Sequence, residues 1–324
     1  MKRIYTKPHK SLKDQIDILK SRGLAIADEE KAEKYLSTIG YYRLSSYWFV
    51  FEEAPIAGIR SHHFKEGVSF DDVVSLYVFD QKLRIIVLEA LERFEITART
   101  SWAYYLSEIG GSHPHLNKSL FKDSEEYDDS LKRLNNDVEK ARVAGSIEIC
   151  HYLRSYDEPK SPPIWVVVSC LTFGELFRWV KNTRDRSVKI EMAKSFDIPG
   201  VKRFESVARS LTTIRNICAH HGRLWDIKIK TRLPLISSNN LRIPFEAVST
   251  NNRTVNGESA KEVDNRLYNV LVILIHVMLE ISPDSSWPAR LETLIDTSLN
   301  ESYLQKMGFP LDWKEKWRKG LKED

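Results

Sequence analysis

Apolar side chains recur every three or four residues along most of the chain, which is the spacing of one face of an α-helix. Ser11 is placed to cap a first helix that Gly23 ends, and Asp28 is placed to cap a second. From Ser69 the pattern continues to Gly110 without a proline or an earlier glycine. We therefore predict one long, uninterrupted helix there.

The same spacing predicts further helices over residues 122–142, 164–180, 187–196, 204–218, 261–281 and 287–299, and from 312 onward. Residues 236–260 are instead rich in Asn, Ser, Thr and Gly and have no period, which predicts a polar loop. The expected architecture is all-α. It has a helical domain over 1–235, that loop, and a C-terminal helical extension over 261–324.

The composition is that of an ordinary soluble globular protein, with 324 residues, 42% of them hydrophobic and 29% charged. The formal net charge of +4 is compatible with a nucleic acid partner but does not require one. Cys150, Cys170 and Cys218 lie far apart and lack the spacing of a zinc site or a disulfide framework. We therefore expect a cytoplasmic protein that needs no metal ion and no other cofactor.

The chain carries no signal for a membrane. Its basic N-terminus is not followed by an apolar stretch, so it does not resemble a secretory signal. The longest apolar run, 267–281, contains Asn269 and His276 and is shorter than the ~20 residues that cross a bilayer. We predict a buried core helix there and no membrane partner.

One short segment concentrates groups that suit RNA cleavage without a metal: Arg215, Asn216, His220 and His221. On a helix, Asn216 and His220 are four residues apart and share a face, and the long side chain of Arg215 can lean towards them. An imidazole can take a proton from a ribose 2′-hydroxyl or give one to the leaving oxygen, and a guanidinium can hold the phosphate.

A structural explanation of the same residues stays open. Two histidines before Gly222 also describe the end of a helix, with Gly222 in the left-handed conformation and the histidines favoured by the helix dipole. The spacing of Arg and His is also loose, since Arg3 and His9 match it by accident in a segment that Pro8 keeps from being helical.

Three other groups are candidates for supporting roles. Tyr42 and Arg43 lie in an aromatic cluster that can stack unpaired bases, although packing is the commoner role of such a cluster. Glu92, Glu95 and Arg99 lie on neighbouring turns of the long helix, either as a surface ladder of ion pairs or as a group that steers Arg215 or His220.

The third group follows the histidines and is basic. Arg223 is followed by Lys228, Lys230 and Arg232 at alternate positions, which would place three cations on one side of an extended chain. Such a strip can lie along a phosphate backbone and make binding sensitive to salt. We therefore predict that these residues contact RNA.

Several short sequence motifs of the chain, taken together, resemble those of a known family. They are Lys7-Pro8 with Ser11-Leu12 and Gln15-Ile16, Ile39 to Ser45 with Tyr47-Trp48, Glu92 to Glu95 with Arg99, and Arg215-Asn216 with Ala219 to His221 and Arg223 to Trp225. In this order, over roughly residues 5 to 235, the chain is similar to the Abi-like abortive-infection family of bacteria, of the AbiD/AbiF type.

The resemblance implies a HEPN-like helical bundle with extra N- and C-terminal helices, and a ribonuclease that acts as a toxin or antiphage effector. It implies that Arg215 holds the phosphate, that Asn216 orients it, and that His220 transfers the proton, although His221 also fits the permitted spacing. It further implies relatives among RNA-guided RNA-cutting systems. For some members it implies a small structured RNA that keeps them inactive.

The expected reaction is attack by the 2′-hydroxyl of an RNA substrate on the adjacent phosphate. Such a displacement needs a base and an acid, and the chain has one credible copy of the motif, so we expect a homodimer that brings two copies together. DNA lacks the nucleophile and should not be cut. The competing hypothesis is a non-catalytic RNA-binding protein that holds a small regulatory RNA.

Overall fold

The computed structural model describes residues 8–55, 58–231, 233–234, 236, 241–255 and 258–322. By compactness the chain divides into two units, Met1–Leu83 and Arg84–Asp324. This division falls between Leu83 and Arg84, within the long helix, and not at residue 235 or 260. The domain boundaries at residues 235 and 260 stay a prediction from the sequence. Arg232 lies outside the described residues.

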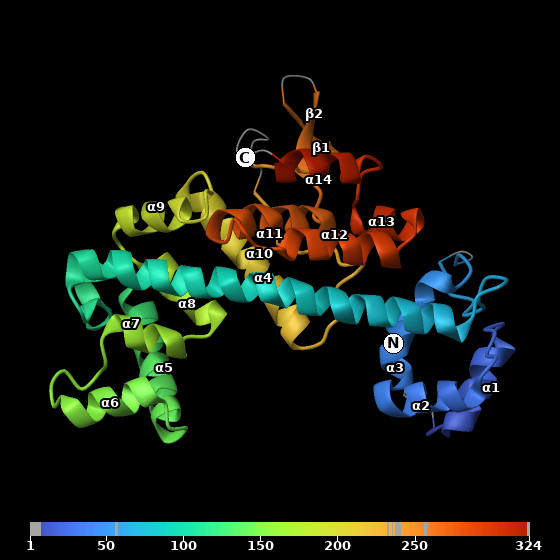
Figure 1. The fold of residues 1–324 in the computed structure, drawn as a ribbon, viewed down its shortest axis with the longest axis horizontal. Coiled ribbons are helices and arrows are strands. Elements are labelled where there is room, and N and C mark those ends of the chain that lie inside the picture. The colour runs from blue at the N-terminus through green and yellow to red at the C-terminus, as the bar shows by residue number, and fades with distance from the viewer. Residues whose placement is uncertain are drawn as a thin grey trace. The chain divides into compact units, whose positions relative to one another are not determined.

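The smaller unit is helical and holds α1 (Leu12–Ser21), α2 (Glu29–Ile39), α3 (Tyr41–Trp48), the 3-10 turn η1 (Phe49–Phe51) and the start of α4 (Phe70–Gly110) (Figure 1). Ser11 and Asp14 form a reciprocal capping box at the start of α1, and Asp28 caps α2, as predicted. In the core of this unit the hydroxyl of Tyr47 donates to Asp80 at 2.7 Å.

The long helix predicted from Ser69 is confirmed as α4. Ser69 and Asp72 cap its start reciprocally, because the Asp72 amide donates to the Ser69 hydroxyl and the Ser69 amide to the Asp72 carboxylate. The helix then continues for 41 residues to Gly110. It therefore passes from the smaller unit into the larger one.

The larger unit is also built mainly of helices, which confirms the predicted all-α class. They are α5 (Ser124–Val143), α6 (Ile147–Ser155), α7 (Ile164–Val167), α8 (Phe173–Asn182), α9 (Arg186–Lys194), α10 (Val201–Ala219), α11 (Leu267–Ile281), α12 (Trp287–Ser298), α13 (Glu301–Met307) and α14 (Trp313–Lys322), with short 3-10 turns η2 (Pro114–Leu116), η3 (Lys118–Leu120) and η4 (Val168–Cys170).

The single helix predicted over 164–180 is wrong, because the chain breaks it into α7, η4 and α8. Leu171 is extended, and the Thr172 side chain accepts a hydrogen bond from the Glu175 amide, which caps α8. Apolar residues continue on both sides of the break, so the hydrophobic pattern hides it. The break leaves the Leu171 carbonyl outside any helix.

A β-hairpin interrupts the helical architecture where the sequence predicts a polar loop. Strand β1 (Ala247–Val255) pairs antiparallel with β2 (Glu258–Val263). Consequently the helix predicted from residue 261 begins only at Leu267. The pairing is irregular between Ser249 and Thr254, which is consistent with a sequence that shows no clear alternation.

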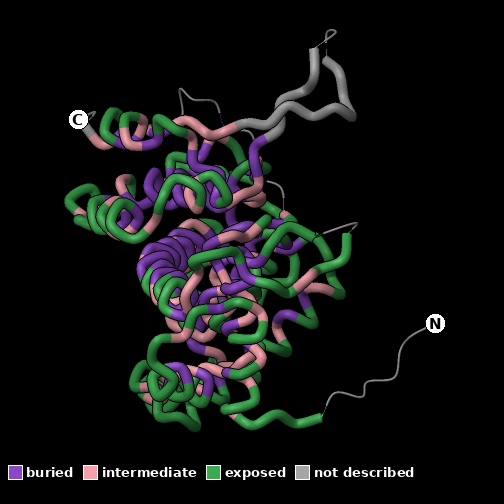
Figure 2. Tube along the Cα trace, turned by 90° about the vertical axis from the view of Figure 1, so that its right-hand side faces the viewer, coloured by how far each residue is buried: buried purple, intermediate pink, exposed green. Residues whose placement is uncertain are grey.

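The core of the larger unit forms around α11 and around a cluster of phenylalanines. Positions 267 to 278 of α11 are all buried, as predicted for a core helix. Phe94 on α4 lies 4.5 Å from Phe196, and Phe196 lies 5.6 Å from Phe204 on α10, measured between ring centroids. Figure 2 shows the buried positions where helices pack on one another and the exposed positions on their outward faces. These rings fix α10 against α4.

Candidate functional site

The helix that carries the Arg and His motif is α10, and its predicted apolar face is confirmed. Each of its stripe residues is at most 1% exposed: Phe204, Val207, Leu211, Ile214 and Cys218. Arg215 is half-buried beside this stripe, whereas Asn216 and His220 are exposed. The motif therefore lies along the border between the core and the solvent.

The helix ends in a Schellman turn. The amide of Gly222 donates to the carbonyl of Ile217 at 2.7 Å, and the amide of His221 donates to that of Cys218 at 3.0 Å. In this turn the residue after the cap takes the left-handed conformation. That residue is His221, with φ 57°, so the expectation that Gly222 fills this position is wrong.

His221 is an unusual residue for this position. A side chain in the left-handed region is strained, and glycine is the usual choice there. His221 is also exposed, so burial in the core does not explain the choice of a large side chain. His220, at the cap, has an ordinary φ of −89°. The turn thus holds two adjacent exposed imidazoles, one of them in a conformation that costs free energy.

Arg215 is held by an acidic residue of α4. Its Nε lies 3.8 Å from Oε2 of Glu95, and Glu95 is only 8% exposed. The other carboxylate oxygen of Glu95 accepts a hydrogen bond from Nη2 of Arg99 at 2.5 Å. One buried carboxylate thus lies between two guanidinium groups, and its position depends on both.

Arg99 has a second anchor, which the broken helix supplies. Its Nη2 also donates to the Leu171 carbonyl at 2.6 Å. That carbonyl is available because the chain is extended at Leu171 between η4 and α8. The break between the two helices therefore contributes directly to the arrangement of Arg99, Glu95 and Arg215.

These charged residues line a pocket of about 410 Å³ between α4 and α10. Its walls are formed by Leu88, Leu91, Glu92, Glu95, Ile96, Arg99 and Arg215. Glu92 is exposed at this pocket and has no ion pair with Arg215 among the described residues. The structure therefore brings Glu92, Glu95 and Arg99 together with Arg215, while His220 and His221 are not among the described lining residues.

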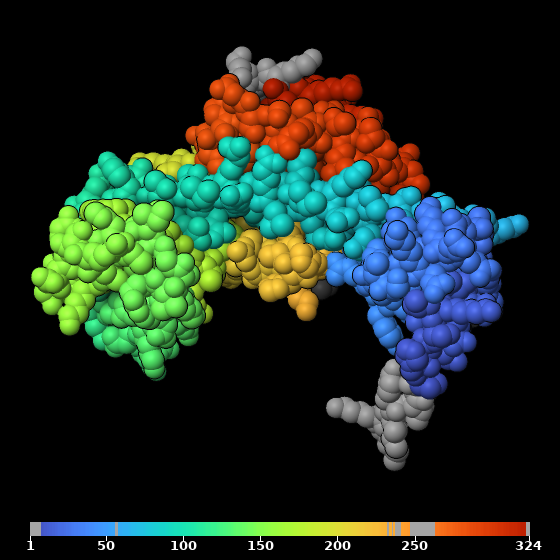
Figure 3. All heavy atoms as spheres, turned by 60° about the horizontal axis from the view of Figure 1, so that its bottom comes forward, coloured from blue at the N-terminus to red at the C-terminus, as the bar shows by residue number. Residues whose placement is uncertain are grey.

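The other end of the motif is held by α4 as well. Nη1 of the buried Arg84 donates to the Gly222 carbonyl at 3.2 Å, where a cation also suits the dipole at the C-terminus of α10. Figure 3 shows the gold segment around the end of α10 at the surface, beside α4 in cyan. The motif is thus fixed to α4 both at Arg215 and at Gly222.

The predicted basic strip is only partly described. Ile229 is buried at 3% exposure and its amide donates to the Asn265 carbonyl, whereas the neighbouring Lys228 and Lys230 are exposed. The two lysines thus share the solvent side of an extended segment. Arg223 is half-buried close to the Schellman turn in sequence. Arg232, the last residue of the strip, lies outside the described residues.

Tyr42 and Arg43 lie in the smaller unit and take different environments. Tyr42 is 73% exposed. Arg43 is half-buried and its guanidinium lies 5.8 Å from the centre of the Tyr77 ring, as a cation–π contact. Packing therefore accounts for Arg43, whereas Tyr42 presents a free aromatic face.

Sequence reasoning missed Arg84, Leu88, Leu91, Ile96 and the Leu171 carbonyl as parts of this site. Each joins it through contacts between segments that are distant in the chain, for which local spacing gives no signal.

Among the described residues, no group of three or more His, Cys, Asp or Glu side chains is arranged as a metal site. Over the same residues, no helix combines the length and apolarity that a bilayer span needs.

The fold and the site define an all-α protein in which a half-buried Arg215 and the exposed Asn216, His220 and His221 lie at the end of a helix held by a second, long helix. Residues 34–226 match the model of the Abi-like protein family. This match covers more than half of the chain, so the chain belongs to the Abi-like protein family, and membership indicates a role in abortive infection. No curated protein and no solved structure matches the chain.

Proposed function

We propose that this protein is a metal-independent endoribonuclease of the HEPN type that acts in abortive infection or as the toxin of a toxin–antitoxin pair. The observation that carries the proposal is the end of α10. It presents His220 and His221 to solvent in the turn that ends the helix on which Arg215 lines a pocket and is held by Glu95. Membership of the Abi-like family supports the biological setting.

In this proposal Arg215 binds the scissile phosphate. Its closest approach to Glu95 is through Nε, so its terminal amino groups lie farther from the carboxylate and can bind a phosphate oxygen. Glu95 and Arg99 position it, because they are themselves fixed by burial and by the Leu171 carbonyl. Asn216, exposed one residue later, orients the same phosphate.

The proton transfers belong to the imidazoles. The 2′-hydroxyl loses its proton to a base and attacks the adjacent phosphorus, and the bond to the 5′-oxygen breaks as that oxygen gains a proton from an acid. The products are a 2′,3′-cyclic phosphate and a 5′-hydroxyl. We assign proton transfer to His220, and His221 is the second imidazole of the same turn.

The base and the acid have to lie on opposite sides of the phosphorus. We therefore propose that two copies of the chain form a two-fold dimer in which each contributes the end of α10. Light scattering coupled to size exclusion should give twice the mass of one chain for the active fraction. Full activity in a strictly monomeric fraction would contradict this part of the proposal.

The nuclease proposal is tested with purified protein, an unstructured RNA and a DNA of the same sequence, in buffer with EDTA. We expect RNA but not DNA to be cut, with cyclic phosphate ends. Arg215→Ala and His220→Ala should each lower the rate at least a hundredfold. Arg209→Ala removes an exposed arginine of the same helix and serves as the matched control. Loss of all cleavage in EDTA would point to a metallonuclease.

A non-catalytic RNA-binding protein is the second candidate, and the exposed Lys228 and Lys230 favour it. Both candidates have RNA as a partner, and a small structured RNA is the proposed inhibitor of the nuclease. Sequencing of nucleic acid that copurifies with the native protein would identify such an RNA. In a phage-plaque assay, unchanged protection by both Arg215→Ala and His220→Ala would favour the second candidate.

A further inference from the structure

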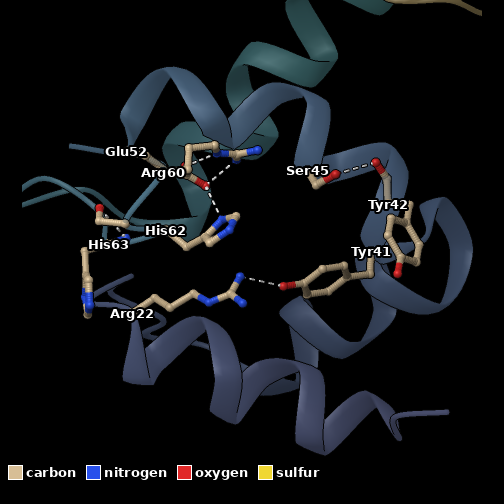
Figure 4. Close-up of polar contacts among 9 residues, drawn as sticks. Arg22, Tyr41, Tyr42, Ser45, Glu52, Arg60, His62 and His63 are labelled. Carbon is tan, nitrogen blue, oxygen red and sulfur yellow. Dashed lines mark hydrogen bonds and ion pairs between the residues drawn. The ribbon is translucent and has the colours of Figure 1, made fainter. Parts of the chain in front are cut away.

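The smaller unit contains its own pocket, of about 600 Å³, between α1, α3 and the segment around Arg60 (Figure 4). We call it the basic–aromatic pocket, after Lys10, Arg22, Arg60, His62, Tyr41 and Tyr42, which line it. No Asp or Glu is found among its described lining residues. Its volume suits a small molecule or one unit of a polymer, and its lining favours an anion.

Two of the three permanent cations are held in fixed orientations. Nε and Nη2 of Arg60 donate to the two carboxylate oxygens of Glu52, both at 2.6 Å, and the Glu52 side chain is only 2% exposed. Across the pocket, Nη1 of Arg22 donates to the Tyr41 hydroxyl at 3.0 Å. Each guanidinium keeps further N–H groups outside these bonds, so the pocket has donors that are positioned in advance.

The same carboxylate lies near His62. Nδ1 of His62 is 3.9 Å from Oε1 of Glu52, and His62 has φ 62°, which is a strained conformation for a side chain of its size. Figure 4 shows His62 and Arg60 on one side of the pocket and Arg22 with Tyr41 on the other. The strained backbone of His62 and the buried carboxylate of Glu52 both indicate a preorganised binding site rather than surface charges that lie together by chance.

Aromatic rings form the remaining wall. Tyr41 packs edge to face on the buried Trp48, with ring centroids 4.8 Å apart, and Tyr42 packs edge to face on Tyr41 at 5.9 Å. Tyr42 is nevertheless 73% exposed, so most of its ring is open to a ligand. Oε1 of Gln15, another lining residue, is buried and accepts no hydrogen bond within the described part of the chain.

We propose that the basic–aromatic pocket binds a nucleotide, with its phosphate on Lys10, Arg22 and Arg60 and its base stacked on Tyr42. The nucleotide is either a free mononucleotide or an unpaired residue of an RNA strand, since both carry the same groups. The proposal concerns the smaller unit and does not depend on the nuclease activity assigned to the end of α10.

The experiment measures binding by full-length protein at low salt, with inactive His220→Ala as the background so that RNA stays intact. The probes are adenosine 5′-monophosphate, adenosine, inorganic phosphate and a 5′-phosphorylated hexa-adenylate. Saturable binding of the monophosphate, tenfold tighter than of adenosine, is the expected result for a free nucleotide. Binding of the hexa-adenylate alone assigns the pocket to an RNA strand.

The variants locate the binding. Lys10→Ala and Arg22→Ala should each weaken it about tenfold, whereas Lys13→Ala, which removes an exposed lysine of α1 outside the pocket lining, should not. Tyr42→Ala should weaken binding of the nucleotide and of the RNA at least fivefold but leave binding of inorganic phosphate unchanged. Because Tyr42 is exposed, the substitution should not disturb the fold. Arg215→Ala should have no effect on the monophosphate.

The proposal is overturned if none of the probes binds saturably. It is also overturned if Tyr42→Ala, Lys10→Ala and Arg22→Ala bind like Lys13→Ala. Loss of monophosphate binding in Arg215→Ala would move the ligand to the end of α10. These outcomes are measured by ligand binding, whereas the nuclease proposal is tested by RNA cleavage, so the failure of one can be distinguished from the failure of the other.

Discussion

The carboxylate of Glu95 on α4 lies 3.8 Å from Nε of Arg215 on α10, and this contact joins two segments that are distant in the chain. Glu95 is buried and also accepts from Arg99, so it is unlike a surface ion pair between two mobile side chains. Removal of one partner from such a group leaves a buried charge without compensation. The position of Arg215 therefore depends on a residue that need not touch the RNA.

From this contact we predict the effect of Glu95→Gln. The amide carries no charge to hold Arg99 and Arg215, so the guanidinium of Arg215 should lose its fixed orientation. We expect kcat/KM for RNA cleavage to fall about tenfold, because small displacements of a positioned group cost this much or more. The measurement is initial cleavage rate at a temperature at which the melting curve shows the variant folded.

The matched control is Glu92→Gln, which changes the same residue type in the same pocket. Glu92 is exposed and has no ion pair with Arg215 among the described residues, so its rate should change at most about twofold. Equal losses from both substitutions would show that the net charge of the pocket matters rather than the contact between Glu95 and Arg215.

A second prediction concerns the left-handed residue of the Schellman turn. His221→Gly should raise the free energy of unfolding by about 1 kcal/mol, because glycine removes the strain at φ 57°. The same substitution should lower cleavage more than tenfold if the strained imidazole takes part in the reaction. Urea unfolding and cleavage assays on the same preparation would measure both effects.

His220→Gly provides the comparison at the neighbouring position. His220 has an ordinary φ, so glycine there should lower stability by about 0.5–1 kcal/mol instead of raising it. A stabilised His221→Gly protein with full activity would refute a chemical role for His221. It would leave His220 as the remaining imidazole of the turn.

The sequence predicts the helices well where one face is apolar and the other polar. The stripe from Phe204 to Cys218 defines α10 because its spacing is local and regular. The break at Leu171 is hidden because buried apolar residues such as Val168 and Phe173 lie on both sides of it. The β-hairpin is hidden for the opposite reason, since residues 247–263 contain too few apolar positions to show an alternation.

The candidate site is predicted from the sequence only in its residue types. The motif residues and the group Glu92, Glu95 and Arg99 are each visible as local patterns, but no pattern pairs Glu95 with Arg215. That pairing follows from tertiary packing, because the cluster of Phe94, Phe196 and Phe204 holds α10 against α4. The left-handed position is missed by one residue, because glycine is the general expectation there and this turn uses His221.

A third prediction concerns the exposed lysines after the turn. Lys228 and Lys230 would each neutralise about one phosphate of a bound RNA, so Lys228→Ala should reduce the slope of log K against log salt by about one. The double variant should reduce it by about two. Binding measured between 50 and 200 mM salt checks this. A single variant with an unchanged slope would show that Lys228 does not touch the backbone.

The last prediction concerns acid stability, which depends on a buried histidine of the larger unit. His115 lies in η2 and is fully buried, and its Nε2 is 3.0 Å from the hydroxyl of Ser161. Burial, with a smaller contribution from His113, lowers the pKa of His115 to about 4. In the unfolded chain the same imidazole titrates near its ordinary pKa of ~6.5.

Between these two pKa values the unfolded chain binds a proton that the folded protein excludes. The contribution of His115 to stability is therefore fully present above about pH 6.5 and is lost as the pH falls towards 4, by about 3 kcal/mol in total. His115→Gln should remove this part of the pH dependence between pH 7.5 and pH 4.5. His151→Gln, at an exposed site, should keep it. Thermal unfolding followed by tryptophan fluorescence measures both, and parallel acid losses in His115→Gln and the parent would contradict the prediction.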